Sequence, residues 1–564
     1  MAERYDHEHV DWPARPWIMA AIGAIGGLIV HLLTDNQHYG TPFPVWRQAA
    51  TSFTVIATVS FLLTVELRRW TWSIWFALGW GAVIALVGWF TAQYNQAGEI
   101  FEFPFFSGIL AVLIAAPLFQ TIRDEGAWRF PYARLHRHAW TDAVIGAASL
   151  AFTGITFLLA WLIASLFDVI GIDAIKDLLQ EEWFSWMLAG LAFGGAIGIL
   201  RERDALVATL QKLAMVILSV LAPVLAVALG AFLLSLPFTG LKGLWESDIP
   251  ATPMLLLSGA GAILLANAVI GDGRDDRSSN IWVRRAALLL VVCVLPLAFF
   301  AALSMGQRIG QYGWTPERIW GVIAVAIAIT YGAAAWWAVF KGRQDFDDPL
   351  RPLQTRLAIG VCGLALFLAL PIVDFGAISA KSQLARLQVG KVKAEEFDWT
   401  AMAFDFGKSG RNHLARIENS GPARQRELAR AALASENRYT LREETKSVAQ
   451  QARLDQYLRI LSPDINVTDA LKAEITGHNG CNDKPCALQR IDTGHLLLVS
   501  NPYGGAVQRR VIDLAKLGGD REDAPTVVAP KPVEADLAKA NIEIRPVERR
   551  QLYVDGKPVG EPFE

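Results

Sequence analysis

The chain has 564 residues, of which 53% are hydrophobic and 19% charged, and its formal net charge is −2. A mean hydropathy of +0.31 is too high for an ordinary soluble globular protein. The net charge alone excludes nothing, but residues 375–564 carry 28 basic and 26 acidic side chains, so they lack the dense basic face expected for nucleic-acid binding. The composition therefore favours a membrane protein.

Apolar segments recur along the first two thirds of the chain, and a helix needs about 20 such residues to cross a bilayer. We interpret about eleven segments as membrane spans. In chain order they cover roughly 17–33, 48–65, 72–92, 104–120, 142–167, 184–200, 213–235, 252–270, 286–304, 319–340 and 357–374. The predicted fold class is an all-α polytopic membrane bundle of about 11 transmembrane helices, followed by a C-terminal α+β extramembrane domain.

Positive residues are concentrated in every second connection between these segments. If the N-terminus is cytoplasmic, 19 of the 24 Lys and Arg before residue 375 lie on the cytoplasmic side. The five on the other side are Arg47, Lys176, Lys242, Arg308 and Arg318. Because short cytoplasmic loops carry an excess of Lys and Arg, the pattern predicts a cytoplasmic N-terminus over 1–16, a membrane domain over 17–374 and a periplasmic tail.

The periplasmic tail divides by composition into two segments. Residues 375–460 are predicted to be helical because apolar positions recur at helical spacing, most clearly over 423–458. Residues 461–564 are predicted to be rich in strands. The segment 495–500 is typical of a buried strand before a turn over 501–505. Residues 551–559 predict a hairpin that turns at Asp555-Gly556.

Two of the four cysteines, Cys481 and Cys486, stand close together in the predicted periplasmic tail. Such a pair on an oxidising side indicates a short-loop disulfide. The alternative is a metal site that also uses His478 or His495. A structural zinc site needs four ligands at recognisable spacing, which the sequence lacks, so the disulfide is preferred and no metal or cofactor is predicted.

Three glycines in the sixth apolar segment, Gly190, Gly194 and Gly198, are spaced four residues apart. This spacing places them on one helix face, where a second helix can approach closely. Packing within the chain is the preferred interpretation, and a dimer interface is the alternative.

No sequence motif for a reaction is present: there is no phosphate-binding loop, dinucleotide fingerprint, zinc-protease motif or nucleophile elbow. No catalytic residue is therefore assigned, and the balance is against an enzyme. No carboxylate is expected near the middle of a span either, which counts against an ion-coupled transporter.

The segment 308–318 carries the strongest local group of polar residues. One interpretation is structural, with Thr315 as a helix N-cap and Pro316 in the first helical position. In the other, functional interpretation, side chains of this segment lie together at the outer membrane face. There they could hold a lipid phosphate, form an ion pair or contact the tail. These candidates are Arg308, Tyr312, Glu317, Arg318 and Asp374.

Residues 308–318, the apolar span after them, and residues 374–387 resemble bacterial multi-pass proteins that carry the domain of unknown function 4153 (DUF4153). The resemblance extends over roughly 140–400. It implies an integral inner-membrane protein of a Gram-negative bacterium, and it brings no activity, cofactor or catalytic residue.

Two functions remain as hypotheses. The first is a non-enzymatic envelope anchor, scaffold or sensor whose residues 375–564 bind an envelope protein. The alternative is a transporter or a permease for a lipid or another anionic substrate. The lipid bilayer is the expected partner in both, and no nucleic acid is expected.

Overall fold

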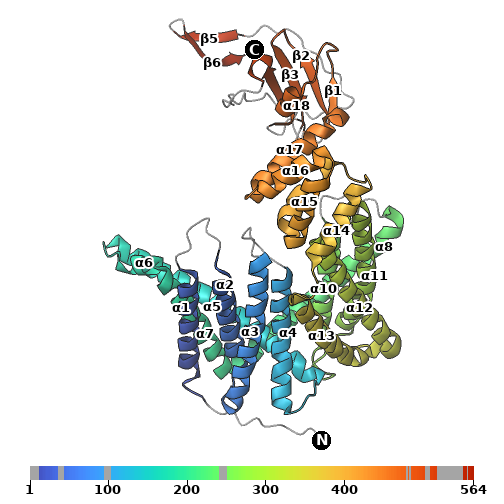
Figure 1. Cartoon of the computed structure of the whole chain (residues 1–564). Coiled ribbons are helices and arrows are strands. Elements are labelled where there is room, and N and C mark those ends of the chain that lie inside the picture. The colour runs from blue at the N-terminus through green and yellow to red at the C-terminus, as the bar shows by residue number, and fades with distance from the viewer. Residues whose placement is uncertain are drawn as a thin grey trace. The chain divides into compact units, whose positions relative to one another are not determined.

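The computed structural model of the chain (Figure 1) describes residues 12–35, 43–94, 103–240, 250–477, 481, 484–501, 508–517, 550–554 and 557–563. Several sequence-based expectations lie outside these ranges: Lys242, His478, and the turns at 502–505 and 555–556. The chain divides into two compact units. The helical unit comprises residues 1–386 and 401–416, and the C-terminal unit comprises residues 387–400 and 417–564.

In its described residues, the helical unit is built almost entirely from long helices. In its first half these are α1 (Arg15–Thr34), α2 (Val45–Thr64), η1 (Leu67–Arg69), α3 (Trp70–Tyr94), α4 (Phe103–Glu125), α5 (Tyr132–Val169), α6 (Ala174–Gln180) and α7 (Glu182–Glu202). In its second half they are α8 (Asp204–Thr239), α10 (Ala251–Ile270), α11 (Ile281–Tyr312), α12 (Pro316–Gly342), η2 (Arg343–Asp345), α13 (Asp347–Ala369), α14 (Phe375–Gln388) and the short helix Ala401–Asp405.

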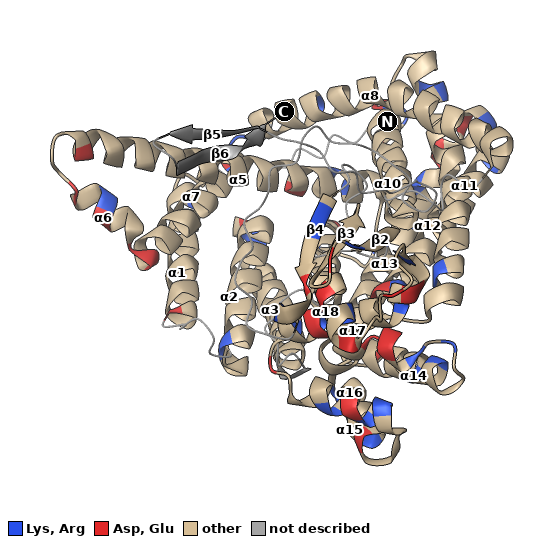
Figure 2. Ribbon diagram, turned by 90° about the horizontal axis from the view of Figure 1, so that it is seen from above, with Lys and Arg blue, Asp and Glu red and all other residues tan. Residues whose placement is uncertain are grey.

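Ten of the described helices are long and apolar enough to cross a membrane. Each of the eleven predicted segments overlaps one long helix, so the polytopic bundle is confirmed, although the last segment, 357–374, extends five residues beyond the end of α13 at Ala369. The helix that is not among the ten is α2, whose first turn carries Arg47 and Gln48. In Figure 2, charged residues are sparse along the long helices, as a lipid surrounding requires.

Helices that are distant in sequence pack side by side: α1 lies against α7, and α13 against α4. The second contact includes a hydrogen bond of 2.9 Å from Ser107 Oγ to the carbonyl oxygen of Ala365. Between α10 and α11, the hydroxyls of Thr252 and Ser304 lie 3.0 Å apart. Small residues and hydroxyl bridges of this kind stabilise helix contacts where water cannot drive association.

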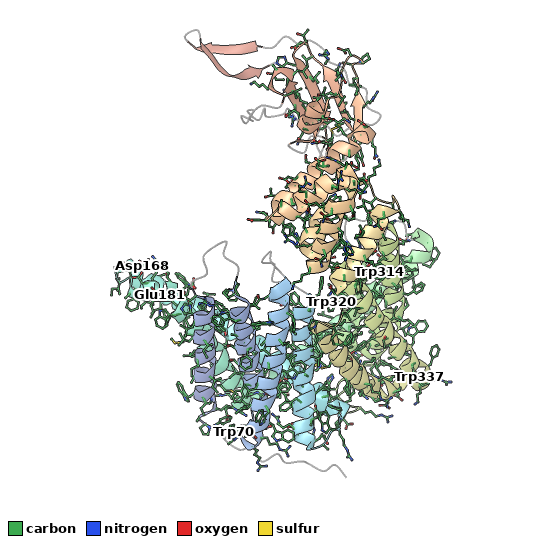
Figure 3. All side chains as sticks on the ribbon, in the orientation of Figure 1. Trp70, Asp168, Glu181, Trp314, Trp320 and Trp337 are labelled. Atoms are coloured by element: carbon green, nitrogen blue, oxygen red, sulfur yellow. A yellow bond between two sulfur atoms is a disulfide. The ribbon has the colours of Figure 1, made fainter. Side chains whose placement is uncertain are left out.

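Exposed tryptophans lie at both ends of the helical unit. Trp70 is at one end and Trp314 at the opposite end (Figure 3). Trp17 and Trp282 are also largely exposed. Indole rings favour the headgroup level of a bilayer, so these positions are consistent with a membrane-spanning bundle whose two interfaces lie near them.

The C-terminal unit contains helices followed by a small sheet. The helices are η3 (Ala394–Glu396), the last turn of α15 (Gly407–Ser420), α16 (Ala423–Ala434), α17 (Arg438–Tyr457) and α18 (Asp469–Thr476). The strands are β1 (Leu458–Ile460), β2 (Cys486–Arg490), β3 (His495–Ser500), β4 (Gln508–Asp513), β5 (Arg550–Val554) and β6 (Lys557–Phe563).

The larger sheet has the order β1-β2-β3-β4, with β1 parallel to β2 and the other pairs antiparallel. β5 and β6 form the expected hairpin. The hydrophobic core of this unit gathers Leu454 of α17, Ile475 of α18 and Leu496 of β3. The sequence-based prediction of a C-terminal α+β part is confirmed.

Candidate functional site

A cavity of about 710 Å³ lies among five helices of the helical unit, α5, α10, α11, α12 and α13. Its lining runs along α10 from Leu255 to Asn267, which corresponds to about 18 Å of helix. The volume lies within the range of small-molecule sites. We treat this cavity as the candidate functional site.

The body of the cavity is apolar, and small side chains leave the space open. Gly259 and Ala260 of α10, Ala298 of α11, and Ala324 and Ala328 of α12 all lie on its wall. Close-packed interiors rarely leave a void of this size. The small residues therefore create a chamber where larger apolar side chains would have filled the bundle.

Polar groups gather at one end of the cavity. The Tyr132 hydroxyl lies 3.1 Å from Nδ1 of His136, both on α5. Gln354 Nε2 of α13 donates a hydrogen bond of 2.7 Å to Asn267 Oδ1 of α10. The hydroxyl of Thr355 completes this polar end. An apolar chamber with a few converging polar groups is the usual architecture of a site that orients an amphipathic ligand.

A proline in α11 shapes the wall between Val294 and Ala298. Pro296 has no amide hydrogen, so the carbonyl of Val292 loses its helical donor. Trp336 of α12 supplies the missing donor, with 2.9 Å from its Nε1 to the Val292 oxygen. The irregular helix is thereby stabilised without a water molecule in the apolar layer.

A charged network adjoins the polar end of the cavity. Asp347 is 2% exposed and forms ion pairs with Arg351 (2.8 Å) and Arg277 (3.4 Å). Arg351 also donates a hydrogen bond of 2.7 Å to the carbonyl oxygen of Ile270, the last residue of α10. The network therefore joins the ends of α10 and α13 and leaves its buried charges paired.

A second buried network lies at the end of α2. Arg123 donates to the Thr64 carbonyl (2.5 Å) and pairs with Glu66 (2.8 Å). Arg201 donates to the Val65 carbonyl at 3.1 Å. Cations and donors are favourable at the carbonyl end of a helix. From the sequence, these arginines indicate only the topology, and their structural role at the end of α2 is not predicted.

The predicted outer-face residues do not form one cluster. Arg318 donates to the Gly313 carbonyl (2.6 Å) and lies over the Tyr312 ring, 5.4 Å from its centroid. Asp374 Oδ1 instead accepts the backbone amide of Ala377 at 2.9 Å, within the first turn of α14. Within the described residues, Asp374 forms no ion pair with Arg308 or Arg318. Thr315 is the N-cap residue of α12, although its side chain makes no capping hydrogen bond.

The two stretches that carry the family resemblance nevertheless pack together. Gln383 Nε2 of α14 donates to the carbonyls of Tyr312 and Trp314, each at 2.9 Å. The Trp314 amide donates to the Ser382 hydroxyl at 3.3 Å. This arrangement, the α14 clamp, holds the turn between α11 and α12. It provides a structural reason for the polar residues in both stretches.

Replacing Arg318 with glutamate should lower the amount of folded protein and its melting temperature. The variant loses the hydrogen bond to Gly313 and the ring contact with Tyr312, and it places a second acid beside Glu317. The expected loss is on the order of 1–3 kcal/mol. Fluorescence-detected size-exclusion chromatography over a temperature series measures it. Arg308→Glu is the matched control, since Arg308 forms no hydrogen bond or ion pair in the described structure. Equal losses in both variants would contradict this role of Arg318.

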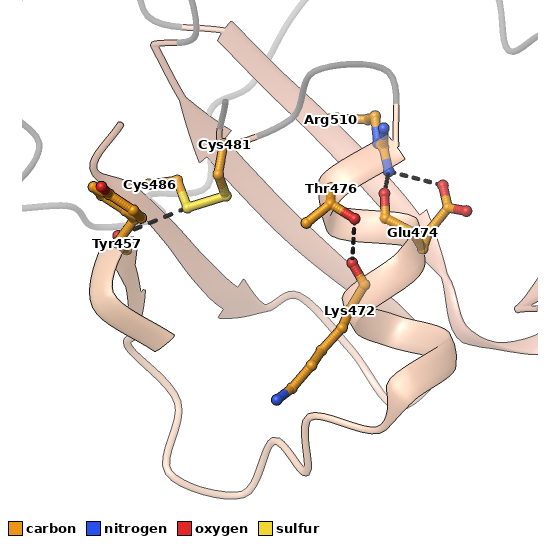
Figure 4. Close-up of a disulfide and its surroundings, with 7 residues drawn as sticks. All are labelled: Tyr457, Lys472, Glu474, Thr476, Cys481, Cys486 and Arg510. Atoms are coloured by element: carbon orange, nitrogen blue, oxygen red, sulfur yellow. Dashed lines mark hydrogen bonds and ion pairs between the residues drawn. A yellow bond between two sulfur atoms is a disulfide. The ribbon is translucent and has the colours of Figure 1, made fainter. Parts of the chain in front are cut away.

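Two other predicted features lie in separate units. Cys481 and Cys486 form a disulfide in the C-terminal unit, and the Cys486 sulfur lies 3.8 Å from the carbonyl oxygen of Tyr457 (Figure 4).

In the helical unit, Gly190 and Gly194 face α1 at backbone contact. The described residues contain no cluster of His, Cys, Asp or Glu that could hold a metal ion.

Comparison with known proteins gives a family match. The family model described as "Domain of unknown function (DUF4153)" matches residues 49–405. No curated protein and no solved structure matches the chain. The matched range is more than half of the chain and includes the cavity helices and the α14 clamp. The chain, with its bundle of apolar membrane-spanning helices, therefore belongs to the DUF4153 family.

Proposed function

We propose that the helical unit binds an amphipathic, lipid-like molecule in the five-helix cavity. The main support for this proposal is the distribution of polar and apolar side chains in the cavity. An apolar chamber of about 710 Å³ has polar side chains at one end. A hydrocarbon portion would lie along the alanine-lined and glycine-lined body. A polar head would meet the groups around His136 and Gln354.

Side access from the bilayer supports a lipid-like ligand. Leu264, on the cavity wall, is 47% exposed although it lies well inside α10, and Ala324 is exposed well inside α12. An opening at that depth meets lipid tails and not water. A molecule dissolved in the membrane could therefore enter between the helices.

The same lining argues against the permeation of ions or free anions. Among the described residues, no Asp, Glu, Lys or Arg lines the cavity. Ion pathways through membranes are marked by charged side chains that face a water-filled space. Binding or carriage of a lipid-like molecule therefore agrees better with the site than permeation of an anionic substrate.

Filling the cavity should abolish the binding of such a ligand. Ala328 is half-buried on the cavity wall, so the indole in Ala328→Trp would extend into the chamber. We expect native mass spectrometry of the purified full chain to detect bound lipid-like molecules. The variant should retain about tenfold less, a change of about 1.4 kcal/mol.

The matched control is Ala326→Trp, two residues away on α12, because Ala326 is exposed and does not line the cavity. This variant should retain the ligand at the wild-type level. If both variants lost the ligand equally, or if neither did, binding in the cavity would be refuted.

A second function is favoured by a separate observation, the independent core of the C-terminal unit. We propose that the bundle also anchors this unit on the periplasmic side of an inner membrane, where it would contact an envelope protein. The supporting features are the alternation of Lys and Arg and the Cys481–Cys486 disulfide, which suits an oxidising compartment.

Single cysteines would test this orientation. Glu436→Cys is in the C-terminal unit and Arg129→Cys is in the loop between α4 and α5, and both positions are exposed. In intact bacterial cells, a membrane-impermeant maleimide should label Glu436→Cys. It should label Arg129→Cys only after the inner membrane is opened. The reverse pattern would refute a periplasmic C-terminal unit.

A further inference from the structure

Two polar atoms at the polar end of the cavity have no hydrogen-bond partner in the described part of the chain. They are Nε2 of His136 and Oε1 of Gln354. His136 is only 8% exposed, and both residues line the cavity. A buried polar atom without a partner costs on the order of 1–3 kcal/mol. A ligand that supplied both partners would recover much of this free energy.

The surroundings would not stabilise a charged head group. In the part of the wall that the structure describes, His136 and two tyrosines are the ionisable side chains. Arg351 does not line the cavity, and its charge is offset by Asp347 at 2.8 Å and Asp348 at 3.1 Å, although its Nε has no hydrogen-bond partner in the described residues. Transfer of an ion into such a site without a counter-charge is strongly unfavourable.

The hydrogen-bonding pattern narrows the chemistry further. The amide nitrogen of Gln354 is already engaged by Asn267, so its free oxygen requires a donor. His136 uses Nδ1 with the Tyr132 hydroxyl and leaves Nε2 for a second partner. A hydroxyl both donates and accepts, so a head that carries hydroxyl groups has the chemistry to satisfy both atoms. A carboxylate or phosphate without a proton only accepts, and it would leave the Gln354 oxygen opposed to another oxygen.

We infer that the cavity is a binding site for an uncharged lipid whose head carries a hydroxyl group, such as a long-chain alcohol or a glyceride. This inference rests on the proposed function and assigns its ligand class. His136 and Gln354 bind the head group, and the apolar body of the cavity holds the hydrocarbon chain of the lipid. Charged bilayer lipids are rejected because the site lacks a counter-charge.

Photo-crosslinking to the purified full chain in lipid nanodiscs tests the inference. The probes are a diazirine-bearing long-chain primary alcohol, and the carboxylate and quaternary ammonium of the same chain length. We expect the alcohol to label peptides of α5, α10 and α13 about tenfold more than either charged probe near neutral pH. In His136→Phe with Gln354→Leu, labelling by the alcohol should fall about tenfold. Gln354→Met alone should give a smaller fall if the double variant does not fold.

The outcomes separate this inference from the proposed function. Equal labelling by all three probes, abolished in Ala328→Trp, would overturn the uncharged head group and leave lipid binding intact. Labelling that Ala328→Trp leaves unchanged, or no labelling of the cavity helices by any probe, would overturn both. Preferential labelling by the carboxylate would show an anionic ligand and overturn the inference.

Discussion

Gly190→Leu should nearly eliminate recovery of folded protein from membranes. A Cβ at Gly190 would overlap the backbone carbonyl of Gly23 on α1, with 2.6 Å to its carbon. The reverse contact, from Gly23 to the carbonyl of Gly190, is equally close. Backbone cannot move aside as a flexible side chain can, so α1 and α7 would have to separate. Even Gly190→Ala should cost on the order of 1–3 kcal/mol.

The effect should be specific to the face that meets α1. Gly154 in α5 is exposed, and a Cβ there would meet nothing within 4 Å. Gly154→Leu should therefore match or exceed the wild type in abundance and thermal stability, because leucine favours a helix more than glycine does. If Gly190→Leu and Gly154→Leu behaved alike in size-exclusion and melting measurements, close packing of α1 on α7 would be refuted.

The glycine face could be predicted from sequence because it depends on local periodicity. Residues spaced four apart lie on one face of any helix, so Gly190 and Gly194 were identifiable before their partner was known. The identity of that partner was not predictable. That α7 packs against α1 depends on how the chain returns through the bundle, which the order of apolar segments does not determine.

The membrane spans and the alternation of positive charge could also be predicted from the sequence. For the arginines, however, only their relation to topology was predictable, and their hydrogen bonds were not. Arg123, Arg201 and Arg351 contributed to the topological bias, and each also donates to a carbonyl at the end of another helix. Such a contact joins residues 59 to 136 positions apart in the chain. Sequence spacing carries no information about it.

The cavity was not predictable for the same reason. Its wall comes from five helices, and each contributes an ordinary membrane-helix pattern of alanine, glycine and leucine. His136 and Gln354 lie near helix ends, where polar residues are expected. Asn267 bonds to Gln354 on another helix, 87 positions away in the chain. Only the three-dimensional arrangement reveals that small residues from several helices leave a common space.

Asp347→Ala should destabilise the helical unit by about 3–5 kcal/mol, as expected when one partner of a buried ion pair is removed. The variant leaves Arg351 and Arg277 without their shared carboxylate at a position only 2% exposed. The Arg277 guanidinium cannot relieve this by losing its proton, because its hydrogen bond to Asp345 raises its pKa. Asp347→Asn keeps the size of the side chain and should reproduce most of the loss, which would identify charge as the cause.

Asp345 provides the matched comparison within the same network. It also pairs with Arg277 (2.9 Å), but its side chain is 53% exposed, so water can replace the contact. Asp345→Ala should stay near the wild-type melting temperature, whereas Asp347→Ala should unfold at a clearly lower one. Similar melting curves for the two variants would mean that the Asp347 carboxylate is solvated. The junction of α10 with α13 would then be held by the Arg351–Ile270 and Gln354–Asn267 hydrogen bonds and by apolar packing. The polar end of the cavity would lack the support of a buried ion pair, and head-group recognition requires rigid support.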